Sequence, residues 1–246
     1  MMAVALLLGL VVGSFLNVVV ARLPEGKSLW GPRSACPRCG QPIAWHDNIP
    51  LLSFLALRGR CRRCHQRIAW RYPLVEVVTG VGFTLALLQF GPTVDGAAAA
   101  LLLAALIAIT AIDLRHQIIP DLITLPGIAA GFVLNLLGGR VPWRDSLIGI
   151  AVGGGIFVII IVMSRGGMGG GDMKLGAMLG AFLGWQLGLL ALFGGALTGG
   201  IAAICLLALG RKGRKDAIPF GPFLALGGAV SLLWGDQILA WYLGPF

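Results

Sequence analysis

Charged residues are scarce in this chain. Only 12% of its 246 residues are Asp, Glu, Lys or Arg, against roughly 25% in an ordinary soluble domain. Apolar residues make up 57%, which excludes both a disordered chain and a conventional soluble domain. Glycine is abundant, with 38 copies, as expected where transmembrane helices pack closely. The composition therefore predicts an all-α polytopic membrane protein.

Acidic residues and histidines are scarcer still. Ten Asp and Glu stand against 19 Lys and Arg, for a formal net charge of +9. In a soluble protein this excess would indicate nucleic acid binding, but in a membrane protein it is first explained by loops that set orientation. The three histidines, His46, His65 and His116, do not form a Ser-His-Asp arrangement with any serine and acid of the sequence.

Apolar segments long enough to approach a membrane span recur along the whole chain. They cover roughly residues 2–20, 74–90, 96–113, 120–138, 146–164, 173–187, 188–209 and 220–243. We therefore expect about eight transmembrane helices, with the least defined boundary near Trp185 and Gln186. In the first segment Ala5, Gly9 and Gly13 recur every fourth residue, a spacing that favours a close helix contact.

The basic residues are distributed unequally between the two sides of this arrangement. Residues 22–72 hold ten of them, and the loops on the same side bring the total to 17, leaving Arg140 and Arg144 outside. This asymmetry predicts a multi-pass membrane protein whose N-terminus is outside and whose 22–72 loop is cytoplasmic. Because no basic region precedes the first apolar segment, we interpret it as a retained helix rather than a cleaved signal.

Four cysteines lie in the 22–72 loop, as Cys36-x2-Cys39 and, 21 residues later, Cys61-x2-Cys64. Two such pairs are typical of a tetrahedral Zn²⁺ site, and four protein ligands indicate a structural ion. The alternative is two disulfides, which a cytoplasmic location disfavours. Since the loop is too short and polar for much of a core, the metal would supply its folding free energy.

Other residues could complete or surround that site. His46 and His65 are alternative metal ligands, although a solvated loop histidine is the simpler interpretation of each. Gly40 follows the first cysteine pair, where a tight turn favours a residue without a Cβ. Cys205 lies alone in an apolar segment and is interpreted as a packing residue.

Four acids stand next to apolar segments, and an ionisable group at the membrane suggests function. They are Glu76, Asp113, Asp121 and Asp172. Asp113 ends one apolar run and Asp172 precedes another, after the run Gly169-Gly170-Gly171, so both are expected at the cytoplasmic edge. Two facing aspartates can share one proton and hydrolyse a peptide bond without a metal.

Each of these acids also has a structural explanation. Asp121 follows Pro120 and would be stabilised as a charge at a helix N-terminus. Asp172 could cap the helix that follows it, and Lys174 could be a basic anchor on the cytoplasmic side. Glu76 could form a salt bridge or interact with a helix dipole.

Six motifs follow one another along nearly the whole chain. They are Gly13-Ser14-Phe15-Leu16-Asn17-Val18-Val19 with Arg22-Leu23-Pro24, the two cysteine pairs, Tyr72-Pro73-Leu74-Val75-Glu76, Ile112-Asp113 with Ile119-Pro120-Asp121, Gly169-x-Gly171-Asp172-x-Lys174, and Ile218-Pro219-Phe220-Gly221-Pro222-Phe223. Together they resemble bacterial prepilin peptidases, which are GxGD-type intramembrane aspartic peptidases.

The resemblance implies an enzyme that removes the basic leader of type IV prepilins and pseudopilins, with Asp113 and Asp172 as the catalytic pair. It also implies methylation of the new N-terminus with S-adenosylmethionine, near the cysteine loop and Glu76, although no nucleotide-binding fingerprint supports this. The expected segments are a first helix (1–21), a zinc loop domain (22–72) and a seven-helix peptidase domain (73–246). The alternatives are a proton transporter or channel and a zinc-containing scaffold of a secretion system. The sequence does not indicate an oligomeric state.

Overall fold

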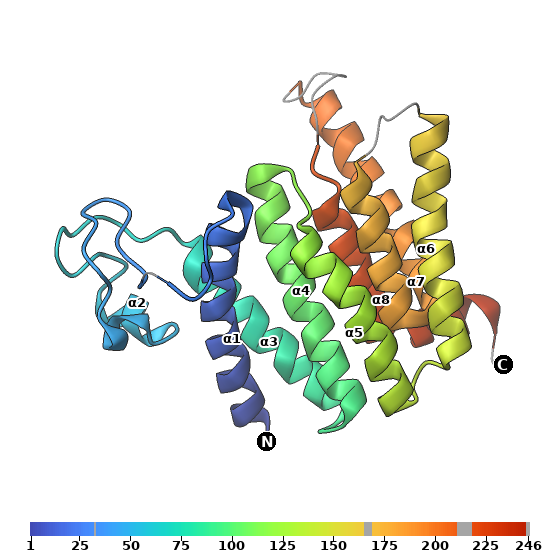
Figure 1. Ribbon diagram of the computed structural model, residues 1–246, viewed down its shortest axis with the longest axis horizontal. Helices are drawn as coiled ribbons and strands as arrows, with labels where there is room; N and C mark the ends of the chain where they lie inside the picture. Colours follow the sequence, from blue (N-terminus) through green and yellow to red (C-terminus); the bar gives the residue numbers. More distant parts are fainter. Residues whose placement is uncertain (32, 165–168, 211–217, 245–246) are drawn as a thin grey trace. The chain divides into compact units, whose positions relative to one another are not determined.

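The structure is a computed structural model that describes residues 1–31, 33–164, 169–210 and 218–244. Its elements are α1 (Met2–Arg22), η1 (Leu23–Glu25), η2 (Trp45–Asn48), α2 (Leu52–Ala56), α3 (Arg71–Phe90), α4 (Val94–His116), α5 (Asp121–Gly138), α6 (Trp143–Met163), α7 (Gly170–Ala208) and α8 (Gly221–Leu243) (Figure 1). Within these residues the only β-type pairings are two isolated bridges. The predicted all-α membrane fold is confirmed.

Seven of the described helices are long and apolar enough to cross a membrane. The longest, α7, has 39 residues and would be about 58 Å long if straight, nearly twice the roughly 30 Å of a hydrocarbon core. It is not straight, because Gly184 has the non-helical angles φ 75° and ψ 179°. The helix is therefore two legs, residues 170–183 and 185–208, joined at this glycine.

The two legs fold back on each other. A Cβ built on Gly188 would lie 3.4 Å from the Cα of Gly180, whereas eight residues of continuous helix advance about 12 Å. Two apolar segments were predicted here, with the split near Trp185 and Gln186, and the break lies at the adjacent Gly184. The first leg is only about 21 Å long, shorter than the hydrocarbon core.

Buried side chains satisfy the backbone carbonyls that the break leaves without helical partners. The Asn135 amide donates to the carbonyls of Ala181 and Phe182, at 2.8 and 3.1 Å, and the Ser146 hydroxyl donates to that of Ala181 at 2.7 Å. Gly184 itself needs to be glycine, because its φ is positive and a Cβ would lie 2.9 Å from Val141. The fold-back is thus specified by polar groups of α5 and α6 as well as by the glycine.

The chain divides into two compact units, residues 1–89 and 90–246. In the first, α1 packs against α3 so closely that a Cβ on Gly9 or on Gly13 would lie 2.7 Å from the Cα of Gly80 or Glu76 respectively. The contact predicted from the glycine spacing in the first helix is confirmed. The functional division at residues 21/22 and 72/73 stays a prediction.

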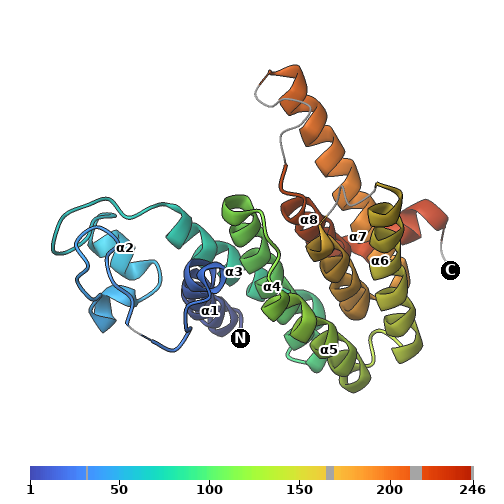
Figure 2. The same ribbon diagram turned by 45° about the horizontal axis from the view of Figure 1, so that its top comes forward.

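In the second unit, the first leg of α7 is the central helix (Figure 2). Every residue from 175 to 184 is buried. Glycines let its neighbours approach, as where Gly149 and Gly153 of α6 meet the backbone of Gly180 and Gly176. Because lipid provides no hydrophobic drive between helices, such close van der Waals packing holds the unit together. Asp172 lies in the first turn of this central helix.

Candidate active site and metal centre

The four cysteines of residues 22–72 form one cluster. Their sulfur atoms all lie within 4.8 Å of one another, and the Sγ atoms of Cys36 and Cys64 are 3.8 Å apart. Thiolates about 2.3 Å from a tetrahedral ion would be separated by about 3.8 Å. The cluster therefore fits a metal ion, as predicted. Neither His46 nor His65 belongs to it among the residues that the structure describes.

The two cysteine pairs adopt the same turn. In each, the first cysteine's N–H donates to a glutamine carbonyl and its own carbonyl accepts from the residue after the second cysteine. The bonds are Cys36 N to Gln41 O (3.0 Å), Gly40 N to Cys36 O (2.9 Å), Cys61 N to Gln66 O (2.8 Å) and His65 N to Cys61 O (3.0 Å). Gly40 has φ 68°, as expected, and His65 takes the same left-handed conformation at φ 55°. His65 is thus a turn residue rather than a ligand.

Backbone N–H groups make the first cysteine of each pair more acidic. The N–H groups of Cys39 and Arg38 lower the pKa of Cys36 to about 7. Those of Cys64 and Arg63 lower the pKa of Cys61 in the same way. Because metals bind the thiolate form, each turn prepares its first cysteine for coordination.

An ion pair connects the two halves of the loop. The Arg62 guanidinium donates to both carboxylate oxygens of Asp47, with Nε 2.8 Å from Oδ2 and Nη2 2.6 Å from Oδ1. These hydrogen bonds hold the pKa of Asp47 below its ordinary value. η2 is thereby held against the second cysteine turn.

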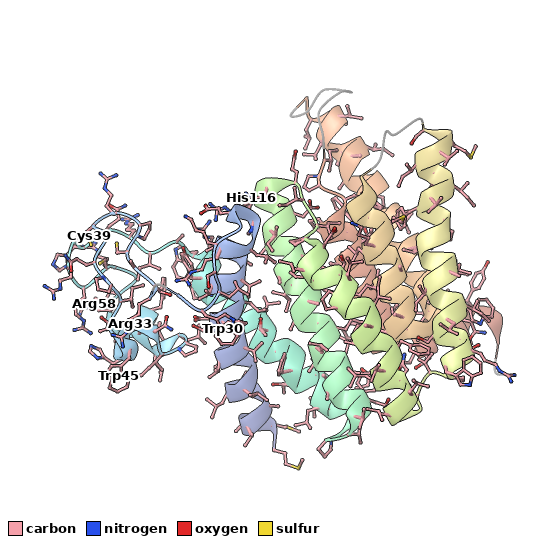
Figure 3. The ribbon with its side chains drawn as sticks, in the orientation of Figure 1. Trp30, Arg33, Cys39, Trp45, Arg58 and His116 are labelled. Carbon is pink, nitrogen blue, oxygen red and sulfur yellow. The ribbon has the colours of Figure 1, made fainter. Side chains whose placement is uncertain are left out.

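Outside the cysteine cluster, the described residues of the loop form no buried core. Trp30 and Trp45 are 94% and 82% exposed (Figure 3). No described residue from 21 to 72 is buried. Burial of apolar surface therefore contributes little to its stability, which leaves the local turns and a metal ion as its main sources.

Glu76 is buried on α3 and makes contacts with two other segments. Its Oε2 accepts the N–H of Leu51 at 2.9 Å, and α1 packs against its backbone, where a Cβ on Gly13 would lie 2.7 Å from its Cα. Leu51 has φ 58°, a costly conformation for a residue other than glycine. Glu76 thus fixes the strained turn before α2 and ties it to α1 and α3. The sequence left open a structural and a functional role for this residue, and these contacts are structural.

Asp113 and Asp172 come from the adjoining ends of two helices. Asp113 is in the last turns of α4, where it is only 4% exposed, and Gln117 ends that helix in the left-handed conformation. Asp172 is half-buried in the first turn of α7. Ile119, in the connection after α4, contacts Gly171, the residue before Asp172, which brings the two helix ends together. Such a pair can share a proton as an aspartic peptidase requires.

The other residues expected around this pair hold the two helix ends together. A Cβ on Gly171 would lie 2.9 Å from the Cβ of Ile119, in the connection after α4. Lys174 donates to both oxygens of Asp121 at 2.7 Å. Gly169 precedes α7 in an extended conformation, while Gly166, Gly167 and Met168 lie outside the described residues.

One contact was not anticipated from the sequence. The backbone N–H of Gly221, the first residue of α8, donates to Oδ2 of Asp113 at 2.9 Å. The motif Pro219-Phe220-Gly221-Pro222 was noted without any role. A proline-rich turn at a helix start was the available signal, because such a turn presents free N–H groups.

Comparison with known proteins shows which family the chain belongs to. Residues 7–90 match the bacterial peptidase A24 N-terminal domain, and residues 100–204 match the type IV leader peptidase family. The chain belongs to the type IV leader peptidase family. The cysteine cluster lies in the first of the matched segments, and Asp113 and Asp172 lie in the second.

Relatives in this family are similar over nearly their full length. The chain is 41% identical to the prepilin leader peptidase/N-methyltransferase of Aeromonas salmonicida strain A449, over 96% of this chain and 92% of the relative. It is 41% identical to that of Pseudomonas aeruginosa, over 97% and 92%, and 43% identical to that of Burkholderia pseudomallei strain 1026b, over 95% and 85%. No solved structure matches the chain. The family resemblance drawn from the motifs is confirmed.

Proposed function

We propose that this leader peptidase family member is a membrane aspartic endopeptidase. It removes the leader of type IV prepilins and pseudopilins at the cytoplasmic face of the inner membrane and then methylates the new N-terminus. The observation that carries the proposal is that Asp113 and Asp172 lie at two adjoining helix ends in a chain of this family.

The reaction needs only the two carboxyl groups and water. One carboxylate takes a proton from water as the oxygen attacks the scissile carbonyl carbon, and the other, protonated, gives its proton to the carbonyl oxygen. The resulting gem-diol collapses when the first group returns its proton to the amide nitrogen and the second removes a hydroxyl proton. The C–N bond breaks, and both groups regain their starting states.

The orientation of the chain supports this substrate class. With residues 22–72 in the cytoplasm and the N-terminus outside, most basic residues lie on one side, as the positive-inside tendency requires. Five of these, Arg165, Arg211, Lys212, Arg214 and Lys215, lie outside the described residues. A prepilin that crosses the membrane with its leader inside would present the cleavage site at the depth of the dyad.

The four cysteines would hold a structural Zn²⁺. Their four sulfurs complete a tetrahedron and leave no open position for catalysis, so the ion would stabilise the loop. S-adenosylmethionine would supply the methyl group. Because the Glu76 carboxylate already accepts the N–H of Leu51, we assign this residue to holding the loop in place rather than to the transfer itself.

The test is cleavage of a purified model prepilin by Asp113→Asn and Asp172→Asn variants in lipid nanodiscs. Each substitution should lower the rate by about 10³-fold or more, since it removes a proton-transfer group. Asp236→Asn is the matched control, because Asp236 is exposed and pairs with Arg140; it should cleave normally. Normal cleavage by either dyad variant would favour the transporter or scaffold alternatives.

A further inference from the structure

Gly221 is placed where a side chain could not be tolerated. A Cβ on it would lie 2.7 Å from Oδ2, 3.2 Å from Cγ and 3.3 Å from Cβ of Asp113. The atoms that it would meet belong to a residue that is only 4% exposed and cannot simply swing into solvent. The backbone of α8 therefore lies so close to the Asp113 carboxylate that no side chain fits between them at position 221.

The turn that presents this N–H is fixed by its neighbours. Phe220 packs against Phe157 of α6 with ring centroids 6.3 Å apart, and a Cβ on Gly199 would lie 3.1 Å from its ring. Pro222 occupies the first turn of α8. The N–H is thus preorganised by packing on α6 and on the second leg of α7.

An N–H group can donate but never accept, so it discriminates between the two forms of a carboxyl group. It favours the ionised form, and the positive end of the α8 dipole acts in the same direction. The Lys174 ammonium, on the same helix as Asp172, is engaged by Asp121. Of two carboxyl groups that share one proton, the one without this N–H donor, Asp172, is then the one that holds the proton.

We propose that Gly221 is a positioning residue that keeps Asp113 ionised through its backbone N–H, which makes Asp113 the base that activates water and Asp172 the acid that protonates the carbonyl oxygen. This rests on the peptidase function proposed above. In the first step Asp113 gains the proton of water and Asp172 loses its own, and collapse of the gem-diol reverses both transfers.

The first test is the Gly221→Ala variant, assayed for prepilin cleavage across pH in nanodiscs. We expect kcat to fall about tenfold or more, as when a hydrogen bond to a charged group is lost, with KM changed less than about twofold because substrate binding is untouched. The acidic limb of the pH–rate profile should move to higher pH, since Asp113 then holds its proton more tightly.

Two alanine variants serve as controls. Gly200→Ala introduces a Cβ that meets nothing within 4 Å. Gly235→Ala, on the same helix as Gly221, meets the Leu187 side chain at 2.6 Å, which is a comparable clash with a flexible group. Both should keep the wild-type pH profile, so that general disturbance of α8 is distinguished from an effect on the dyad.

A second variant isolates the hydrogen bond from the clash. An ester in place of the amide at Gly221, introduced by cell-free translation, removes the N–H and adds no side chain. It should reproduce the lower kcat and the shifted acidic limb. A wild-type rate and profile for the ester would overturn the proposal even if Gly221→Ala is inactive.

The dyad variants tell failure of this proposal from failure of the proposed function. If Asp113→Asn and Asp172→Asn cleave normally, the peptidase function fails. If they are inactive and the ester behaves as wild type, only the role of Gly221 fails.

Discussion

Two parts of this chain reach a defined structure by opposite means. Between residues 21 and 72, none of the described residues is buried, and order comes from repeated turns around four sulfurs. In the first leg of α7, every residue from 175 to 184 is buried, and order comes from helices in backbone contact. Although most of the chain is apolar, the segment from residue 21 to residue 72 is therefore not stabilised by burial of apolar side chains.

The difference follows from the surroundings of each part. A segment of about 50 residues is near the lower size limit for folding on a hydrophobic core, and no described residue from 21 to 72 is buried, so cross-links take the place of a core. Within lipid, an apolar side chain gains no hydrophobic free energy by contacting another helix instead of lipid. Close packing of small residues therefore determines which helices lie together. Metal ligands should therefore dominate the stability of the first part and glycines that of the second.

Removal of the metal should have the largest effect and should separate the two parts. Cys36→Ser with Cys61→Ser, or chelation, should make residues 22–72 protease-sensitive while the helices of residues 90–246 stay protected, because structural zinc contributes about 10–16 kcal/mol. Metal analysis should find about one Zn²⁺ per chain in the unsubstituted protein. Cys205→Ser is the control, since Cys205 is outside the cluster. A metal-free loop that resists protease would contradict this account.

A large side chain in the contact between α6 and α7 should have an intermediate effect on stability, and only in the helices of residues 90–246. In Gly180→Leu the new side chain must displace the backbone of Gly149, which should cost about 1–3 kcal/mol or more. Thermal unfolding in detergent should show a lower midpoint and weaker cleavage, with metal content unchanged. Gly155→Leu, where a Cβ meets nothing within 4 Å, should behave as the unsubstituted protein. Equal stability of the two variants would show that glycine packing is not what holds this unit.

The ion pair between Asp47 and Arg62 should have the smallest effect and depend on pH. Because Arg62 lowers the pKa of Asp47, its contribution is present above the ordinary carboxyl value of 3.8 and is lost as pH falls through the lowered value. Asp47→Asn should reduce protease resistance of the loop only slightly at neutral pH, because ion pairs exposed to solvent contribute little. It should not differ from the unsubstituted chain at strongly acidic pH. Asp236→Asn should leave the loop unchanged at every pH.

Features that depend on local spacing or composition could be predicted from the sequence. The cysteine ligands, the turn at Gly40, the glycine contact of α1 and the apolar segments all follow from neighbouring residue types. The pair Asp113 and Asp172 could be selected because few acids border the apolar segments. The break in α7 was expected near Trp185 and Gln186, but an apolar run with frequent glycines does not mark which glycine leaves the helix, and the structure places it at Gly184.

By itself, then, the sequence determined that this is a helical membrane protein with a four-cysteine loop, a basic side and two candidate aspartates. Only the tertiary structure decided that α7 folds back at Gly184, that Glu76 fixes the turn at Leu51, and that the N–H of Gly221 meets Asp113. The physical reason is the same in all three cases. Each depends on main-chain groups that every residue carries, and their partners are chosen by packing between distant segments rather than by residue type.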